Sequence, residues 1–143
     1  MIHVPVSKLK ELCDPYLYHP WGVKVPKSKV QKAVNCGNLL EIPISNLRAN
    51  GRKPTANDHA ARIAYFIVNG FKDPISLDVG IPSMGYSMDW ILTDGNHRLA
   101  AAIFANLATV PVEFSGEVEF FKELFNLSDV DLTQSDNSVS IPT

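Results

Sequence analysis

Five consecutive residues, Asp94-Gly95-Asn96-His97-Arg98, bring an acid, a glycine, an imidazole and a guanidinium to one short stretch of the chain. They follow an apolar segment that we expect to be a short strand, residues 90–93, and they precede an alanine-rich segment that we expect to be a helix. The first amides of a helix have no partner within it and lie at the positive end of the helix dipole. A strand-to-helix corner of this composition therefore predicts a site for an anion such as phosphate.

Each residue type in this corner has a chemical reason to lie beside a phosphate. Gly95 lets the backbone approach closely because it has no Cβ, and Arg98 offers a planar fork of donors that fits phosphate oxygens. His97 offers a donor that we expect to become cationic near neutral pH. Asp94 would cap the helix, hold Mg²⁺ or take a proton from a hydroxyl group. The alternative is a plain turn in which Asp94 caps a structural helix and both basic side chains are solvated.

Apolar periodicity and turn residues divide most of the chain into short elements. Asn57 or Asp58 is expected to cap the helix that precedes the corner, and Gly70 is expected to end it. The predicted helices are residues 7–12, 28–35, 57–69, 97–106 and 117–127. The predicted strands are residues 39–44, 75–79, 90–93 and 110–114, and residues 80–88 are expected to form a mobile, hairpin-like loop.

Two segments lie outside the predicted domain, which spans residues 39–127. Residues 1–38 are expected to form an N-terminal arm with short helices, in which the prolines between Asp14 and Pro26 argue against regular structure. The aromatic residues of that stretch are expected to pack the arm onto the core. Residues 128–143 are polar, acidic and weakly patterned, and we expect a disordered tail.

Charge is distributed unevenly along the 143 residues. Residues 1–53 carry nine Lys and Arg against three acids, whereas residues 113–143 carry one against seven. A basic first third favours an anionic partner such as nucleic acid, although a solvated basic face offset by an acidic tail explains the same counts.

The remaining composition excludes several classes of protein. Cys13 and Cys36 have neither metal-ligand spacing nor a CxxC motif, and no Cys/His cluster predicts a zinc site. The N-terminus lacks the layout of a signal peptide, and the longest purely apolar run, Leu99 to Ala105, is far too short to span a membrane. We therefore expect a cytoplasmic protein with reduced cysteines and no membrane association.

The corner and its surroundings resemble the ParB/sulfiredoxin superfamily. Residues 94–102 are similar to its Asp-Gly-x-His-Arg-x-x-Ala signature. The segment "IPISNLRAN" (42–50) resembles its opening strand and turn, "ARIAYFIVNGFKDPISL" (61–77) its first helix, glycine and Pro-Ile strand, and "WILTDGNHRLAAAIFANLATVPVEF" (90–114) its strand, phosphate corner, helix and final strand. The similarity covers roughly residues 39–115. It implies an α+β fold, with a small mixed β-sheet flanked by helices, that holds nucleotide phosphates at the corner.

Members of this superfamily differ in the reaction that follows. Sulfiredoxins reduce a sulfinic acid with ATP, a free-serine kinase uses ADP, ParB partition proteins bind and hydrolyse CTP, and some plasmid members are described as nucleases or ATPases. Sulfiredoxins have Cys where this chain has Asn96, which argues against sulfinic acid reduction. Partition ParB has Arg where this chain has His97, and it carries a downstream helix-turn-helix for which this chain has no room. The Asp-Gly-x-His-Arg form is closer to the kinase-like and stand-alone members.

The resemblance thus implies a nucleotide-dependent phosphotransferase or nucleotide hydrolase that uses ATP or another nucleotide, with Mg²⁺ as a candidate ion. Asp94 and His97 are the candidate catalytic residues, and Asp94 is also the candidate Mg²⁺ ligand. The candidate phosphate contacts are Gly95, Asn96, His97, Arg98 and Arg52.

Two other functions stay open at this point. One is a nucleic-acid-binding or nicking protein of the ParB-like nuclease type, which would grip DNA through the basic first third of the chain. The other is a catalytically inactive regulatory binder, whose aromatic arm and acidic tail would contact a protein partner. Glu41 is a weaker candidate for a second catalytic carboxylate, and His59 is expected to be a solvated first-turn residue. Small size and the lack of accessory domains would suit a phage or plasmid protein.

Overall fold

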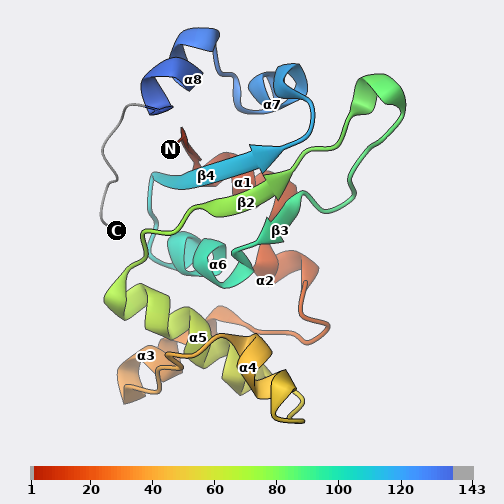
Figure 1. Ribbon diagram of the computed structural model, residues 1–143. Coiled ribbons are helices and arrows are strands. Elements are labelled where there is room, and N and C mark those ends of the chain that lie inside the picture. The colour runs from red at the N-terminus through yellow and green to blue at the C-terminus, as the bar shows by residue number, and fades with distance from the viewer. Residues whose placement is uncertain (1, 137–143) are drawn as a thin grey trace.

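A four-stranded mixed sheet in the order β1-β4-β2-β3 forms the centre of the fold (Figure 1). The computed structural model describes residues 2–136, with side chains up to Leu132. β4 (Thr109–Ser115) pairs antiparallel with β1 (Ile2–Pro5) and parallel with β2 (Ile75–Asp78), and β2 pairs antiparallel with β3 (Leu92–Asp94). The α+β class with a small mixed sheet, expected from the sequence, is confirmed.

Helices stack away from this sheet in successive layers. α6 (Asn96–Phe104) packs against β2 and against α5 (Ala56–Asn69), and α5 packs in turn against α3 (Lys27–Cys36) and α4 (Ile44–Ala49). The run Ala100-Ala101-Ala102 in α6 is completely buried. Because alanine side chains are short, the neighbours can approach the backbone of α6 closely from more than one side.

Two hydrophobic clusters correspond to these layers. The larger one lies on the sheet and includes the fully buried side chains of Ile75, Leu99 and Phe121. The smaller one lies between the helices and includes Val30 of α3 and Ile63 of α5. Full burial of one such side chain contributes roughly 1.5–3 kcal/mol to stability. The hydrophobic effect therefore stabilises the helical layer as well as the sheet.

The first 38 residues belong to the same structure. β1, which the sequence pattern did not predict, forms an edge strand on β4, and α1 (Val6–Cys13) buries Leu9 in the core of the sheet. The short helix α2 (Pro15–Tyr18) forms in spite of the nearby prolines because Pro15 occupies the first turn, where a helix needs no N–H donor. Residues on both sides of position 38 therefore share one sheet and one core.

The segment predicted as the first strand, residues 39–44, is not a strand. Leu40 N donates a hydrogen bond to Ala61 O of α5 at 3.0 Å, and α4 begins at Ile44. The segment thus lies along α5 and does not join the sheet. The opening strand that the superfamily resemblance implied for residues 42–50 is consequently absent from the structure.

Thr55, and neither Asn57 nor Asp58, caps α5. The Thr55 hydroxyl accepts a hydrogen bond from Asp58 N at 3.3 Å, and the Asp58 carboxylate accepts one from Thr55 N at 2.8 Å. This reciprocal pair is a capping box, in which Asp58 serves as the third helical residue. The helix nevertheless ends before Gly70, as predicted.

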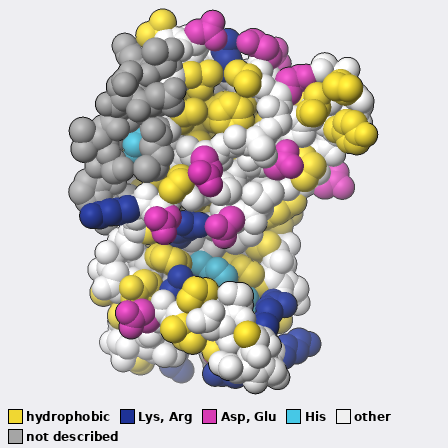
Figure 2. Space-filling model, viewed as in Figure 1, with side chains coloured by type: hydrophobic (Ala, Val, Ile, Leu, Met, Phe, Trp, Pro, Cys, Tyr) yellow, Lys and Arg dark blue, Asp and Glu magenta, His cyan; other side chains and the backbone are white. Residues whose placement is uncertain are grey.

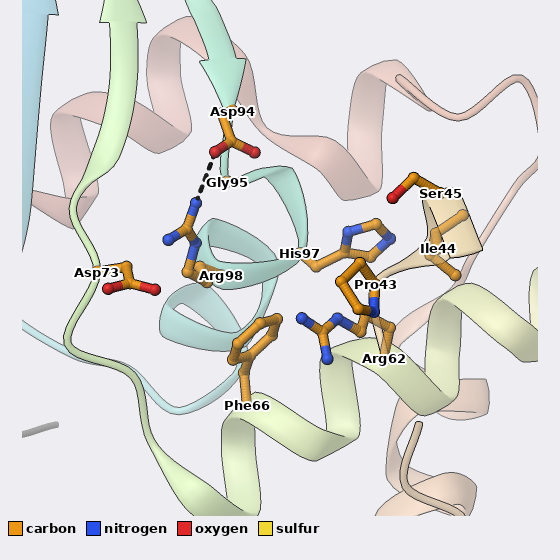
Figure 3. A pocket seen from close by; sticks show the side chains of 10 residues that line it. All are labelled: Pro43, Ile44, Ser45, Arg62, Phe66, Asp73, Asp94, Gly95, His97 and Arg98. Carbon is orange, nitrogen blue, oxygen red and sulfur yellow. Dashed lines mark hydrogen bonds and ion pairs between the residues drawn. The ribbon is translucent and has the colours of Figure 1, made fainter. Parts of the chain in front are cut away.

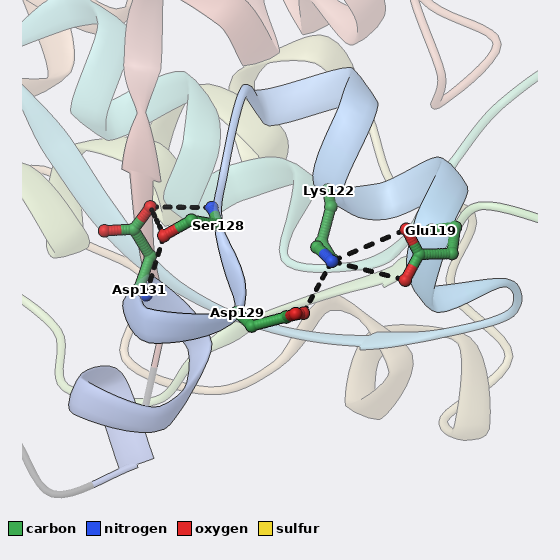
Figure 4. Close-up of polar contacts among 5 residues, drawn as sticks. All are labelled: Glu119, Lys122, Ser128, Asp129 and Asp131. Atoms are coloured by element: carbon green, nitrogen blue, oxygen red, sulfur yellow. Dashed lines mark hydrogen bonds and ion pairs between the residues drawn. The ribbon is translucent and has the colours of Figure 1, made fainter.

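Residues 129–136 are helical, so the expectation of a disordered tail is wrong over this range. A second capping box starts α8 (Asp129–Asp136): Ser128 N donates to the Asp131 carboxylate at 2.7 Å, and Asp131 N donates to the Ser128 hydroxyl at 3.2 Å (Figure 4). Lys122 of α7 (Val118–Phe125) adds an ion pair with Asp129 at 2.5 Å. Residues 137–143 of the predicted tail lie outside the described residues.

The other predicted elements are found close to their expected positions, apart from β3, which begins two residues late at Leu92. The loop at residues 80–88 is hairpin-like, with a single-turn helix η1 (Pro82–Met84) and a bridge between Ile81 and Tyr86. Figure 1 shows α3, α4 and α5 at the opposite end of the molecule from α7 and α8. Within residues 2–136, no helix combines the length and apolar character needed to cross a membrane.

Candidate functional site

A pocket of about 490 Å³ opens where the start of α6, the middle of α5 and the start of α4 meet (Figure 3). Its volume lies within the range of small-molecule sites, roughly 300–1,000 Å³. The residues that line it are Pro43, Ile44, Ser45, Arg62, Phe66, Asp73, Asp94, Gly95, His97 and Arg98. Four of the residues singled out in the sequence, Asp94, Gly95, His97 and Arg98, are therefore brought together at one pocket.

Gly95 forms the corner between β3 and α6. Its φ of +107° lies in the left-handed region, where residues with a Cβ are strained. A Cβ at this position would also lie 3.1 Å from Ile75 Cγ1 and 3.2 Å from the Arg98 guanidinium. Gly95 is the N-cap of α6 and offers no side chain to cap it. The glycine therefore leaves the helix start uncovered and gives Arg98 room to lie against the backbone.

Arg98 is buried, with 9% of its surface exposed, and its guanidinium pairs with Asp94 Oδ2 at 3.2 Å. The Asp94 side chain is itself 77% exposed. One interpretation of the sequence was that Asp94 caps α6. Asp94 does not cap the helix but orients Arg98, which lies one helical turn later in the chain. Because the carboxylate faces solvent, it can turn away, but the buried guanidinium of Arg98 then needs another anion in its place.

Arg62 of α5 is a second cation at the pocket, half-buried, and sequence reasoning missed it. Its Nη1 donates to the carbonyls of Leu40 at 3.2 Å and Glu41 at 2.5 Å. Its guanidinium also lies 4.4 Å from the ring centroid of Phe66. Burial lowers the Arg62 pKa, with nearby Arg98 acting in the same direction. Arg62 therefore fixes the 39–43 segment at the rim of the pocket.

His97 forms a pair with His59, which is only 1% exposed. Nδ1 of His59 and Nε2 of His97 are 2.9 Å apart, a hydrogen bond between α5 and α6. Trp21 stacks on both imidazoles, with ring centroids 5.0 Å from His59 and 4.6 Å from His97. The expectation that His59 is solvated is wrong, because the capped start of α5 turns it inward toward α6.

Both histidines are neutral at neutral pH. Burial lowers the pKa of His97 to about 3, assisted by His59, Arg62 and Arg98. Burial and Arg48 lower the pKa of His59 to about 4, against an opposing effect of Asp58. The prediction that His97 becomes cationic near neutral pH is therefore wrong, and the positive charge at the pocket comes from the two arginines.

Three other sequence candidates do not line the pocket. Arg52 is exposed and pairs with Asp58 at 2.6 Å, beside the start of α5. Glu41 is exposed, and its backbone carbonyl, not its carboxylate, contacts Arg62. Asn96 is the first residue of α6, and its buried Oδ1 has no hydrogen-bond partner among the described residues.

A cation at this pocket would find two carboxylates, Asp73 and Asp94. Among residues 2–132, no group of three or more His, Cys, Asp and Glu side chains is arranged to hold a metal ion. Mg²⁺ usually retains several waters and takes one or two carboxylates together with substrate phosphates. The pocket therefore suits an ion that arrives with a phosphorylated ligand better than an ion held by protein alone.

Comparison with known proteins does not extend this description: no family model, no curated protein and no solved structure matches the chain.

The buried histidine pair predicts a specific loss of stability in acid. The unfolded histidines have a pKa of about 6.5 and take up protons that the folded pair excludes. The stability that the neutral histidines contribute should be fully present above that pH. It should decline as the pH falls toward their pKa values in the folded protein, about 4 and about 3. Between about pH 7.5 and 5.5 the free energy of unfolding should drop by about 1 kcal/mol per histidine.

Urea denaturation at the two pH values measures this loss. The variant His97→Gln should show a smaller drop in the free energy of unfolding than the wild-type protein, because only His59 then takes up an additional proton on unfolding. An equal drop in both proteins would mean that His97 titrates normally in the folded state.

Proposed function

We propose that the pocket binds a nucleotide through its phosphates, and that the protein is a nucleotide-dependent phosphotransferase or nucleotide hydrolase of the ParB/sulfiredoxin type. The observation that carries this proposal is the convergence of Arg98, Arg62 and the glycine corner of α6 on one pocket of about 490 Å³. Two guanidiniums and an uncapped helix start provide donors for several phosphate oxygens at once.

The environment of the two arginines favours a phosphate ligand. Both guanidiniums are partly withdrawn from water, and their interaction with an anion is stronger there than on an exposed surface. Phe66, Ile44 and Pro43 give the same pocket an apolar wall. A ligand with phosphates at one end and a ring system at the other would use both parts.

The carboxylates and the neutral histidine supply candidate roles in turnover. Asp94 would hold a Mg²⁺ ion that accompanies the nucleotide, or would accept a proton from an attacking hydroxyl group. His97, which is neutral, would donate or accept a hydrogen bond without adding charge. The Asp-Gly-x-His-Arg signature supports the proposal, as does the following helix-strand unit, although the expected opening strand is missing. A nucleotide substrate agrees with the cytoplasmic location expected from the sequence.

Calorimetric titration with ATP, ADP, CTP and GTP, with and without Mg²⁺, tests binding. Arg98→Ala should weaken the best ligand by roughly 10- to 150-fold, because charge-assisted hydrogen bonds contribute about 1.5–3 kcal/mol. Arg98→Lys should be intermediate, since it keeps the charge but loses the fork. Arg52→Ala is the matched control, because Arg52 is exposed and outside the pocket. Absence of binding to all four nucleotides would remove the proposal.

The role of Asp94 is tested by separating binding from turnover. Asp94→Asn should change nucleotide affinity measured without Mg²⁺ by less than about fivefold, because the amide oxygen still accepts a hydrogen bond from Arg98. Turnover should fall by at least about 100-fold if the carboxylate acts as a base or as a metal ligand. Phosphate release and transfer to small hydroxyl acceptors are the two assays. Equal losses of affinity and turnover would contradict the catalytic role, and binding without turnover in the wild type would favour a regulatory binder.

A second function, binding to a nucleic-acid backbone, is favoured by the charge of the helical layer. Lys24, Lys27, Lys29, Lys32, Arg48 and Lys53 form a basic lobe, and within residues 2–132 none of them has a carboxylate within 4.0 Å. Figure 2 shows Lys and Arg side chains at the end that carries α3 and α4, and Asp and Glu at the end that carries α7 and α8. This separation of charge would orient a polyanion toward the basic lobe.

Fluorescence anisotropy with labelled single- and double-stranded DNA tests this second function. Binding through the basic lobe should weaken by at least about tenfold between about 50 and 200 mM salt, because counterions are released from the DNA. Lys29→Gln/Lys32→Gln should reduce both the affinity and the salt dependence. Lys8→Gln is the control, because Lys8 lies on α1 beside Glu11. Salt-independent binding, or no binding, would exclude this reading.

A further inference from the structure

We infer that His59 is a positioning residue that fixes the hydrogen-bonding state of His97, and that Trp21 completes the assembly by stacking on both rings. The contacts among the three rings are seen in the structure, whereas their consequence for nucleotide binding rests on the proposed function. His59 does not line the pocket and would act only through His97.

The hydrogen bond between the two rings limits what His97 can do. A neutral imidazole carries one proton, on either Nδ1 or Nε2. Only one proton can lie between His59 Nδ1 and His97 Nε2, which are 2.9 Å apart. If His59 donates, His97 carries its own proton on Nδ1, and if His59 accepts, Nδ1 of His97 is free to accept. In either case the bond at Nε2 determines the state of Nδ1.

Nδ1 is the ring nitrogen of His97 that remains for a ligand. His97 lines the pocket together with Arg62 and Arg98 (Figure 3). Within the part of the chain that the structure describes, Nδ1 of His97 has no hydrogen-bond partner. A phosphate or hydroxyl oxygen held by the arginines would thus meet a ring nitrogen whose role, donor or acceptor, is set by where the proton between the two rings lies.

Trp21 covers the pair with its indole ring. The indole plane is within 24° of His59 and 22° of His97, so that it stacks on both rings together. Two contacts hold this part of the arm: Tyr16 Oη donates to Ala100 O at 2.8 Å, and Val25 is buried between the helices. Stacking against an indole keeps water from the imidazoles, which favours their neutral forms.

Charged groups surround the pair on both helices. Arg48 and Asp58 act on His59 with opposite signs, and Arg62 and Arg98 both oppose protonation of His97. The two arginines are the groups proposed to hold phosphate. A neutral, oriented imidazole beside them adds a directed hydrogen bond where a third positive charge would be repelled.

The first test needs neither a variant nor a ligand. The chain contains four histidines, His3, His19, His59 and His97, so nitrogen-15 spectra of histidine-labelled protein can be assigned. We expect a nitrogen–nitrogen coupling across the hydrogen bond between His59 and His97, and a single tautomer for His97 between about pH 5.5 and 8. A His97 that exchanges between tautomers, or the absence of the coupling, would overturn the inference.

Two substitutions of His59 separate positioning from simple packing. His59→Phe keeps a ring under Trp21 but removes the hydrogen bond, and His97 should then exchange between tautomers. His59→Asn keeps a polar atom near the position of Nδ1, and His97 should stay in one tautomer. Near-ultraviolet circular dichroism reports whether each variant is folded. An unchanged His97 spectrum in folded His59→Phe would show that His59 only fills space.

Nucleotide titration of the same variants tests the consequence at the pocket. His59→Phe should bind the best nucleotide about five- to tenfold more weakly, the loss expected for one hydrogen bond, and His59→Asn should stay within about threefold of wild type. Equal affinity in all three proteins would overturn the role of His59 at the pocket. A locked His97 in a wild-type protein that binds no nucleotide would refute the proposed function but leave the positioning of His97 by His59 intact.

Discussion

The burial of α6 between the sheet and α5 is the constraint on which the site depends. Leu99 of this helix belongs to the cluster on the sheet, whereas Ala100 and Ala101 belong to the cluster between the helices. Consecutive residues of a helix point about 100° apart, so α6 can face both layers, and its short alanine side chains let the helical layer come close. This packing fixes the direction of α6, and its first turn must therefore emerge beside the middle of α5. The pocket is a consequence of where that turn ends.

The same packing explains why cationic arginines and neutral histidines lie side by side. The two guanidiniums each have partners: Arg98 pairs with Asp94, and Arg62 contacts two backbone carbonyls and an aromatic ring. A protonated His97 would be a third cation at the same pocket, and both arginines oppose its protonation. The hydrogen bond between the rings and the stacking of Trp21 accommodate both imidazoles in their neutral forms. In a medium of low polarity this requires less free energy than an additional positive charge.

The sequence predicted those helices and strands that are determined by interactions between residues close together in the chain. The periodicity of α5, the alternation of β2 and the alanine run within α6 are patterns of neighbouring residues, and the corner at Gly95 could be recognised from them. Two of the failures, the 39–44 segment and β1, came from contacts between distant residues. The 39–44 segment has the composition of a strand, but Arg62 and Ala61 of α5 take its backbone groups. β1 exists because β4, more than a hundred residues later, offers an edge.

The residues of the site show the same difference between neighbours in sequence and residues that only the fold brings together. Gly95, His97 and Arg98 are neighbours in sequence and were found together, whereas the bond between His59 and His97 spans 38 residues and has no local signature. Arg62 carried a signal that could have been used, because an arginine within the apolar helix ARIAYFIV must find polar partners. Ser128 and Asp131 also carried one, since Ser-x-x-Asp is the pattern of a capping box. Such signals are recognisable in sequence, but their partners become known only from the fold.

The balance of charge at the pocket bears on which ligand suits it best. Two arginines attract a phosphate, but Asp73 and Asp94 at the same pocket would repel it. A bare anion, or the backbone of a nucleic acid, would therefore meet both signs of charge at close range. A nucleotide that carries a divalent cation presents both signs as well, with oxygens for the guanidiniums and a metal for the carboxylates. Asp94 is exposed, and among residues 2–132 its carboxylate pairs with Arg98 alone, so it can turn toward such an ion while Arg98 takes a phosphate oxygen in its place. The ion pair between Asp94 and Arg98 would then be exchanged for two ligand contacts, and this exchange would favour a metal-nucleotide over the simpler anions.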